Sequence, residues 1–328
     1  MFGLFLGAAA KVDQSMRVVT YSLSVDGPPQ TTDYHEQLFS SVKSLRAYNR
    51  VVAIHVFLYG EHPGEFVLGL ENEGVTIHHM GAYADAVQRI RPRAFRILAR
   101  YPLLHKWMNF HKLAAVQPSQ VLQVDCDTFF FHDVEILFDR YSECHYYGRE
   151  EPSSKASPYG YNPDYLDEDK LFALAQREGA AAVNPYNIGV SLLNHGLWTE
   201  IAKRTGMFLS YAFRFLAGMG RDPQTREKLW PDFARVVMVD LFEQPDVADL
   251  PFPSSNLWIL DQIALWLTMG HVPNFTHGRL SRDHVLQGGE QNGNCPTKVI
   301  HHYFGVDKTA FLAALSQQAA MKLTAGQA

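Results

Sequence analysis

The chain has 328 residues, of which 47% are hydrophobic, 12% aromatic and 19% charged. Such a composition can fill a sizeable hydrophobic core, and it lacks the low hydropathy and high charge of a disordered chain. The formal net charge of -5 offers no basic stripe for a polyanion, so we expect no nucleic-acid partner.

The cysteines and the N-terminal residues indicate the expected compartment. Cys126, Cys144 and Cys295 are too few and too scattered for a disulfide framework, which favours a reducing compartment. The apolar residues 2–10 follow no basic segment and are far fewer than the ~20 residues that span a bilayer. We therefore predict a cytoplasmic protein without a transmembrane segment. Residues 1–15 then form a tail that packs on the body, is disordered, or contacts a membrane peripherally.

Strand-like and helix-like segments alternate along the chain. Runs of β-branched and aromatic residues predict strands at residues 16–24, 51–58, 75–80, 120–125, 188–193 and 298–304. Apolar residues at helical spacing predict helices at residues 38–45, 94–101, 105–116, 197–204, 208–217, 257–269 and 308–319. This alternation predicts an α/β fold with a mostly parallel, doubly wound sheet flanked by helices, and a more helical C-terminal half. Ligands of such sheets bind at the carboxyl ends of the strands.

A polar segment divides the chain into two halves. Residues 150–169, EEPSSKASPYGYNPDYLDED, are rich in Pro, Ser, Gly and acidic side chains. We predict one domain over residues 16–320, with a first half at 16–150 and a second at 170–320. Residues 321–328 are expected to form a C-terminal tail.

Two aspartates end one of the predicted strands, in the sequence VLQVDCDTFFF. At a spacing of two along an extended chain, Asp125 and Asp127 leave on the same face, so one divalent cation can take oxygens from both. Without a cation, the paired negative charges raise a pKa or lower stability. The alternative is that one aspartate caps the following turn and the other is solvated. Cys126 between them is expected to be apolar filler on the opposite face.

A pair of histidines lies in the last predicted strand, in the sequence VIHHYFGVDK. A neutral imidazole could complete the coordination of a metal held by two carboxylates. Since neighbouring residues of a strand point to opposite faces, at most one of His301 and His302 is expected to face that site. The alternative is that both are ordinary core or surface histidines.

Taken in chain order, these motifs resemble those of the family-8 glycosyltransferases of the GT-A fold, the group that contains glycogenin and the lipopolysaccharide galactosyltransferases. The similar segments are VTYSLS, FHKLAAVQPSQVLQVDCDTFFFHDVEILF, NIGVSLLN, LDQIALWL and HYFGVDK, and they span residues 18–308. The resemblance implies a retaining, metal-dependent transfer of a sugar from a nucleotide diphosphate sugar, with a UDP-sugar as the expected donor. The first half would hold nucleotide and metal, and the second half the sugar and an unidentified glycan, lipid-linked, protein or small-metabolite acceptor.

The resemblance also implies the ligands of the metal and of the diphosphate. Asp125, Asp127 and His302 match the manganese ligands, and magnesium is the alternative ion. Lys308 matches a lysine that contacts the phosphates and assists the reaction, and Gly305 belongs to the same H-x-x-G-x-x-K motif. A divalent ion and an ammonium group both stabilise the charge that develops on a leaving nucleoside diphosphate.

The resemblance places four further residues near the nucleotide. Thr20, Tyr21 and Ser22 match the strand end that meets the base and ribose. For Thr20 and Tyr21, simple packing within the strand is an equal alternative. Lys112 is similar to a basic residue ahead of the metal motif.

The sugar pocket is implied by two more motifs. Asn187 and Gly189 match residues before the donor-sugar pocket. Asp261 and Gln262 match a catalytic pair beside the sugar and its anomeric carbon, although Asp261 could equally cap its helix. An amide such as that of Gln262 is a poor nucleophile, which agrees with retention of configuration without a protein nucleophile.

Departures from the family pattern leave two other functions open. Thr309 and Ala310 replace the Pro-Trp that commonly follows the final lysine, and the segment 27–29 changes the loop after the first strand. One alternative is therefore a nucleotide-sugar-binding protein that has lost transfer. The other is a nucleotidyltransferase or hydrolase acting on a diphosphate, since an acidic pair and a lysine also serve such chemistry.

Overall fold

The computed structural model describes residues 16–25, 34–92, 98–99, 102–150, 168–219, 258–288, 290 and 297–303. Gly305, Lys308, most of the predicted helix at 94–101 and the predicted helix at 308–319 lie outside the described residues. The strands are β1 (Arg17–Ser24), β2 (Ala53–Tyr59), β3 (Thr76–Gly81), β4 (Gln120–Val124), β5 (Thr128–Phe130), β6 (Tyr146–Glu150), β7 (Tyr186–Leu193), β8 (His277–Arg279), β9 (Val285–Gln287) and β10 (Ile300–His302). The helices are α1 (Tyr34–Tyr48), α2 (Gly64–Asn72), α3 (Tyr83–Ile90), α5 (Phe110–Val116), α6 (Glu135–Arg140), α7 (Glu168–Arg177), α8 (Leu197–Lys203), α9 (Thr205–Met219) and α13 (Trp258–Met269), with a 3₁₀ helix η2 (Pro102–Met108).

All six predicted strands are confirmed, as β1, β2, β3, β4, β7 and β10. The predicted helices that became α1, α8, α9 and α13 are confirmed as well. The prediction of one helix over residues 105–116 is wrong, because the chain forms η2 and then α5 with Asn109 between them. The Asn109 side chain donates to Ser22 Oγ and accepts from the Tyr59 hydroxyl, which ties this break to β1 and β2. Four short strands, β5, β6, β8 and β9, were not predicted.

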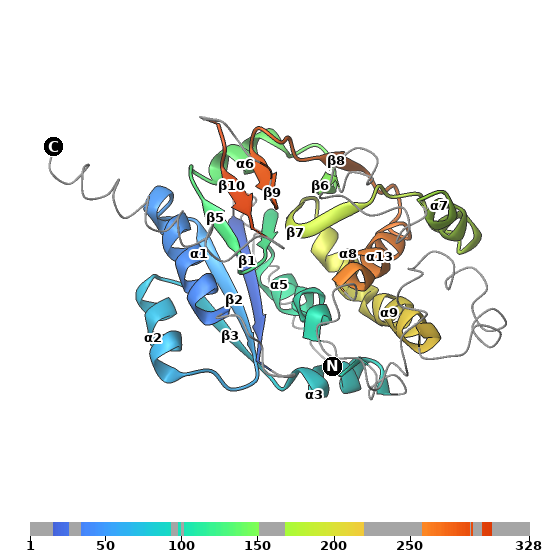
Figure 1. The fold of residues 1–328 in the computed structure, drawn as a ribbon, viewed down its shortest axis with the longest axis horizontal. Helices are drawn as coiled ribbons and strands as arrows, with labels where there is room; N and C mark the ends of the chain where they lie inside the picture. Colours follow the sequence, from blue (N-terminus) through green and yellow to red (C-terminus); the bar gives the residue numbers. More distant parts are fainter. Residues whose placement is uncertain are drawn as a thin grey trace, which may run out of the picture.

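Within the described residues, the central sheet has seven strands in the order β3-β2-β1-β4-β7-β6-β8 (Figure 1). Six of these strands run in one direction, and only β7 is antiparallel to its neighbours β4 and β6. The prediction of a mostly parallel sheet is therefore confirmed. The chain builds outward from β1 to β2 and β3 and then returns to place β4 on the other side of β1. This reversal creates a switch point between β1 and β4, where ligands of open α/β sheets bind.

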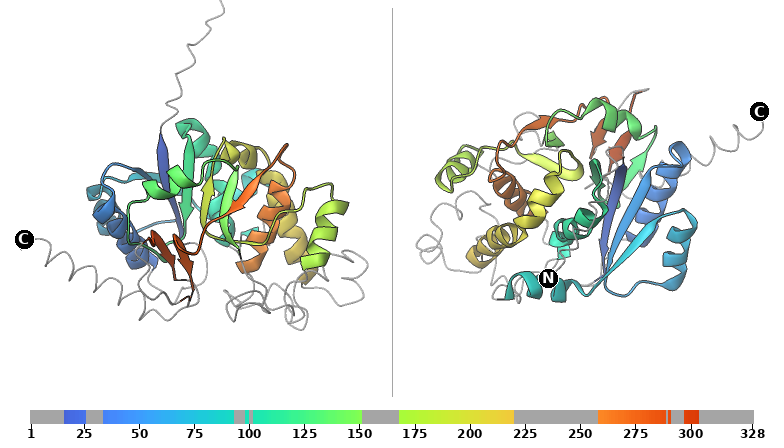
Figure 2. Two further views of the ribbon diagram at one scale, coloured as in Figure 1. Left: turned by 90° about the horizontal axis from the view of Figure 1, so that it is seen from above. Right: turned by 180° about the vertical axis from the view of Figure 1, so that it is seen from behind.

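Helices cover both faces of this sheet, as the two further views show (Figure 2). Alternate side chains of each strand join different apolar clusters, as the two-residue period of a strand requires. In β2, for example, Val56 and Leu58 pack with the side of the sheet that α1, α2 and α6 cover. Phe57 and Tyr59 pack with the side that α3, α5, α8, α9 and α13 cover. Both faces are buried, so polar side chains are left to gather at the strand ends.

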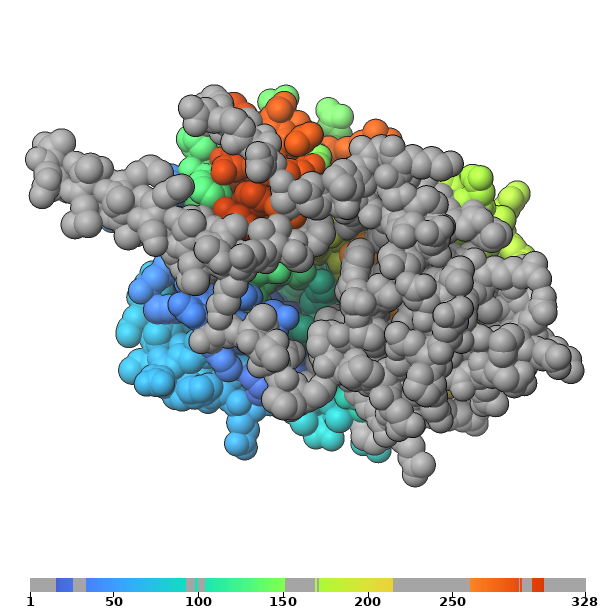
Figure 3. Space-filling view, viewed as in Figure 1, coloured from blue at the N-terminus to red at the C-terminus, as the bar shows by residue number. Residues whose placement is uncertain are grey.

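A second, three-stranded sheet with the order β5-β10-β9 lies at the carboxyl end of β4 (Figure 1). The chain passes from β4 into β5 through the residues Asp125, Cys126 and Asp127. β10 pairs antiparallel with β5, so that His302 lies opposite Thr128. On the face in Figure 3, the described residues of β9 and β10 (orange to red) lie above those of α1 and α2 (blue). The small sheet thus brings a distant part of the sequence to the switch point.

Candidate functional site

Asp125, Cys126 and Asp127 form a turn between two sheets, and are not part of an extended strand. The prediction that a spacing of two along a strand brings the two carboxylates together is therefore wrong. The carboxylates do converge, but across a turn. Hydrogen bonds to β7, to β1 and to the residue that follows β10 hold the turn. Asp125 N donates to Gly189 O at 2.8 Å, the Cys126 thiol donates to Ser22 O at 3.5 Å, and Tyr303 N donates to Asp127 O at 2.9 Å. These tertiary contacts orient the carboxylates, because the local strand period does not extend across the turn.

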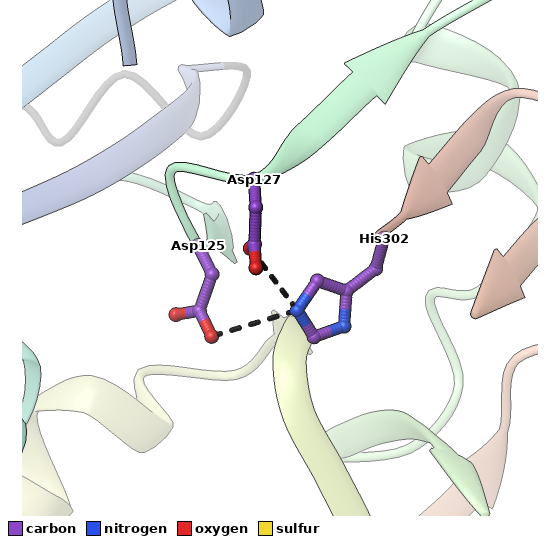
Figure 4. Close-up of side chains that lie close together, drawn as sticks. All are labelled: Asp125, Asp127 and His302. Atoms are coloured by element: carbon purple, nitrogen blue, oxygen red, sulfur yellow. Dashed lines mark ion pairs between the residues drawn. The ribbon is translucent and has the colours of Figure 1, made fainter. Parts of the chain in front are cut away.

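Both carboxylates point toward one imidazole (Figure 4). His302 Nε2 lies 3.2 Å from Asp127 Oδ1 and 3.7 Å from Asp125 Oδ2. One ligand atom from each residue lies within 4.8 Å of the other two, and the described residues contain no other such group of His, Cys, Asp and Glu. Adjacent ligands of an octahedral ion at ~2.1 Å lie about 3 Å apart, so the spacing fits a divalent cation. Two carboxylate oxygens and an imidazole nitrogen are ligand atoms that divalent metal ions accept.

The two histidines of β10 have opposite environments, as predicted. The His302 side chain is 4% exposed and faces the carboxylates. Burial alone would lower the pKa of His302, but Asp127 and Asp125 hold it above its ordinary value. His301 stacks on Tyr303 with ring centroids 4.0 Å apart, and burial lowers its pKa to about 4. A proton on His302 and a divalent cation are therefore alternative partners for the acidic pair.

The lowered pKa of Asp127 favours its charged carboxylate, as a metal ligand requires, whereas Cys126 is unsuited to bind a metal. Burial alone would raise the pKa of Asp127, but the neighbouring His302 keeps it below its ordinary value. Burial and the adjacent carboxylates raise the pKa of the Cys126 thiol well above its ordinary value. A protonated, buried thiol packs as a small apolar group, which agrees with the expected filler role.

Gly189 gives the His302 ring its space. A Cβ atom at this position would lie 1.9 Å from His302 Cε1, so any side chain would displace the imidazole or the strand. The Asn187 side chain accepts a hydrogen bond from Gly189 N at 2.9 Å, which holds the strand in this position. Both residues are in β7 and were predicted to precede the sugar pocket. The structure places Gly189 directly against the metal-ligand candidate His302.

Lys106 is a site residue that the sequence analysis missed. Its Nζ lies 2.9 Å from Asp125 Oδ1 and 3.6 Å from Asp261 Oδ2, so it joins η2 to the acidic turn and to α13. Burial alone would lower the pKa of Lys106, but Asp125 and Asp261 hold it above its ordinary value. Lys112, the residue chosen from the sequence, lies on the exposed side of α5. The break at Asn109 separates these two lysines, and a continuous helix gave no reason to prefer Lys106.

Asp261 is the most strongly buried carboxylate of the group, with 5% of its side chain exposed. Burial raises its pKa to about 7, although Lys106 opposes the shift. Its Oδ1 is buried and accepts no hydrogen bond from the described residues. Asp261 is the fourth residue of α13 and therefore does not occupy the capping position that was the alternative. Gln262 follows it and is 3% exposed.

The three residues predicted to meet the nucleotide differ in what they contact. Thr20 is 3% exposed and Tyr21 is fully buried, with its hydroxyl 2.9 Å from Ser41 Oγ. This is the packing alternative stated for these two residues. Ser22 is partly buried and accepts a hydrogen bond from the Asn109 side chain, so its own hydroxyl proton can be donated. Of the three, Ser22 is best placed to contact a ligand.

None of the described helices is both long and apolar enough to pass through a membrane.

Comparisons with known proteins do not show to which family this chain belongs. No protein-family model and no curated protein matches it. A similar solved structure is that of mouse xyloside xylosyltransferase 1 in its apo form, at 11% identity and a TM-score of 0.47, covering 88% of this chain and 97% of that one. Others are the galactosyltransferase LgtC with donor and acceptor sugar analogues (13%, 0.40, covering 88% and 87%) and the apo bifunctional glycosyltransferase WbbM (13%, 0.45, covering 92% and 48%). All three scores are below 0.5, so the function proposed below depends on this chain's own side chains.

Proposed function

We propose that the protein is a metal-dependent, retaining glycosyltransferase that takes a sugar from a nucleotide diphosphate sugar, with a UDP-sugar as the donor. The observation that carries the proposal is the convergence of Asp125, Asp127 and His302 at the switch point of an α/β sheet. Lys106 and Asp261 lie directly beside them. Anionic ligands with a bound cation are the chemistry that such a group of side chains recognises.

The three convergent side chains would hold manganese, or magnesium, each through one atom. When bound, the ion would supply Lewis-acid stabilisation of a departing diphosphate. Lys106 holds Asp125 in place through its ammonium group, and that group adds positive charge at the same strand end. Ser22 would donate to the nucleoside. Gly305 and Lys308 are proposed to line the nucleotide side, whereas Thr20 packs within its strand and Lys112 lies on the exposed side of α5.

Asp261 and Gln262 are proposed to act on the sugar. The buried Oδ1 of Asp261 can accept a hydrogen bond from a sugar hydroxyl, which would give this oxygen a donor. The amide of Gln262 cannot form a stable covalent sugar intermediate, so retention would proceed on one face of the sugar without a protein nucleophile. Asn187 and Gly189 support this pocket through β7.

Calorimetric titration with UDP-, GDP- and ADP-sugars tests donor and metal together. We expect one donor to bind in the presence of manganese and not with chelator. Asp127→Ala should abolish this binding, whereas Asp139→Ala, at a 69% exposed aspartate of α6, should leave it unchanged. Metal-independent binding, or binding indifferent to Asp127, would sink the proposal.

Product analysis separates the alternative reactions. Release of nucleoside diphosphate supports glycosyl transfer, whereas release of nucleoside monophosphate supports nucleotidyl transfer or hydrolysis. Tight donor binding without turnover on a panel of acceptors would favour a binding protein. The anomeric configuration of the product, measured by NMR, tests retention.

A further inference from the structure

A chain of three buried hydroxyl groups leads from the core to the acidic turn. The Tyr21 hydroxyl lies 2.9 Å from Ser41 Oγ, and Ser41 Oγ lies 3.0 Å from Thr128 Oγ1. Thr128 Oγ1 donates to the backbone carbonyl of Asp125 at 2.8 Å. Tyr21, Ser41 and Thr128 are all fully buried, and they come from β1, α1 and β5. Side chains from β1, α1 and β5 are therefore linked by hydrogen bonds to the carbonyl group of Asp125.

The direction of every hydrogen bond in this chain is fixed. A carbonyl oxygen can only accept, and each hydroxyl has one proton. Thr128 gives its proton to Asp125, so it must accept from Ser41, and Ser41 in turn must accept from Tyr21. Burial raises the pKa of Tyr21 well above its ordinary value, so this phenol keeps the proton that the chain requires. Removing the Tyr21 hydroxyl leaves Ser41 Oγ without its donor, although Thr128 can still donate to the Asp125 carbonyl.

The chain completes a two-sided hold on the Asp125 backbone. On one side Asp125 N donates to Gly189 O of β7, and on the other the hydroxyl chain donates to Asp125 O. We propose that Tyr21, Ser41 and Thr128 are positioning residues, which fix the backbone of Asp125 so that its carboxylate meets the Asp127 carboxylate and the His302 imidazole as one cation site. This inference rests on the proposed function. It assigns Tyr21 to the metal site through its hydroxyl and gives it no contact with the nucleotide.

Manganese titration of single and double variants tests the chain. Partners that orient a metal ligand typically change affinity ~10- to 100-fold, so we expect this loss for Thr128→Val, and about 3- to 10-fold for the more remote Tyr21→Phe. Because both act through the same carbonyl, the double variant should bind manganese no more weakly than Thr128→Val alone. Additive losses, or wild-type affinity in Tyr21→Phe, would overturn the proposal.

Tyr146→Phe provides the matched control. Tyr146 is also fully buried, and its hydroxyl lies 2.8 Å from a serine, Ser191 Oγ. Its hydroxyl makes no described bond to the acidic turn, so this variant should lose similar stability in urea unfolding while keeping wild-type manganese affinity. An equal loss of affinity in Tyr146→Phe would show a general structural effect and overturn the proposal. If the wild type itself does not bind manganese, the proposed function fails as well. If the wild type binds manganese and only the variants depart from expectation, the positioning proposal alone fails.

Discussion

The acidic site and the histidine pair of the β2–β3 edge both bury ionisable side chains, but they favour opposite charge states. At the site, burial alone would lower the pKa of His302, but Asp127 and Asp125 raise it above its ordinary value and so favour the charged imidazole. In the edge pair, His55 Nδ1 and His78 Nε2 lie 2.9 Å apart. Burial, and then the neighbouring His78, lower the pKa of His55 to about 4.

The difference between the two regions lies in how their polar atoms are satisfied. The edge pair forms its own hydrogen bond, and His78 also stacks on Phe57 at 4.5 Å, so two neutral rings need no ligand. At the site, Asp261 Oδ1 is buried without a donor among the described residues, and three carboxylates face one lysine and one histidine. Charge that the fold does not neutralise by itself marks the region that is built for a ligand.

The largest effect is expected from Gly189→Ala, which breaks the site without changing its charge. The new Cβ would meet His302 Cε1 at 1.9 Å, so the ring must move away from both carboxylates. We expect manganese affinity to fall more than about 100-fold and stability to fall by about 1 to 3 kcal/mol. Gly64→Ala is the control, since a Cβ there meets nothing within 4 Å. Unchanged metal binding in Gly189→Ala would contradict the assignment of His302.

Lys106→Met tests whether the lysine balances the site's negative charge. Removing one partner of a buried ion pair leaves Asp125 and Asp261 uncompensated, so we expect a loss of about 3 kcal/mol in the free energy of unfolding. Lys106→Met/Asp261→Asn should recover most of this stability, but none of the donor binding. Lys203→Met, at a lysine that is 63% exposed, should change stability by less than about 0.5 kcal/mol. Equal losses at Lys106 and Lys203 would refute the charge argument.

Asp261→Asn should stabilise the protein at alkaline pH. The pKa of Asp261 is raised to about 7 in the folded protein, so its contribution to stability is present at pH below about 4 and is lost as the pH rises through 7. Between pH 5 and pH 8, the stability of the variant relative to wild type should therefore rise by about 2 to 3 kcal/mol. Chemical unfolding at both pH values measures this. A variant that is less stable at pH 8 would show that the Lys106 pair outweighs burial.

The smallest effect concerns the edge pair. Because the pKa of His55 is lowered to about 4, its contribution to stability is complete above pH 6.5 and is lost as the pH falls toward 4. His55→Gln should therefore reduce the loss of stability between pH 7 and pH 5 by about 1 kcal/mol. His79→Gln, at the exposed neighbouring histidine of β3, should keep the wild-type pH profile. Parallel profiles for all three proteins would remove the contrast with His302.

The main strands could be predicted because burial on both faces leaves a direct signal. Continuous apolar runs such as VVAIHVFL identify strands before any partner is known. The strands that were missed are three to five residues long, and β6 begins with the pair Tyr146 and Tyr147 in an otherwise polar segment. Such strands form because a neighbour supplies hydrogen bonds and packing, and neither is visible in their own residues.

The candidate site could be predicted only in part, because only some of its residues leave a signal in their own segment of the sequence. Asp125, Asp127 and His302 lie in motifs whose residue types indicate a metal site. Lys106 was missed because the break at Asn109 depends on hydrogen bonds to Tyr59 and Ser22, which are far away in sequence. The fully buried Tyr21 hydroxyl likewise gained its partner only through packing of α1 against β1 and β5.

The sequence by itself determined the α/β class, the main strands and the acidic residues that follow β4, because hydrophobic period and residue chemistry are local properties. Tertiary structure decided that Asp125 and Asp127 converge across a turn, that His302 rather than His301 faces them, and that Lys106 joins Asp125 to Asp261. The physical reason is strand pairing between distant segments: β10 pairs with β5, roughly 170 positions away, and β4 pairs with β7, roughly 70 positions away.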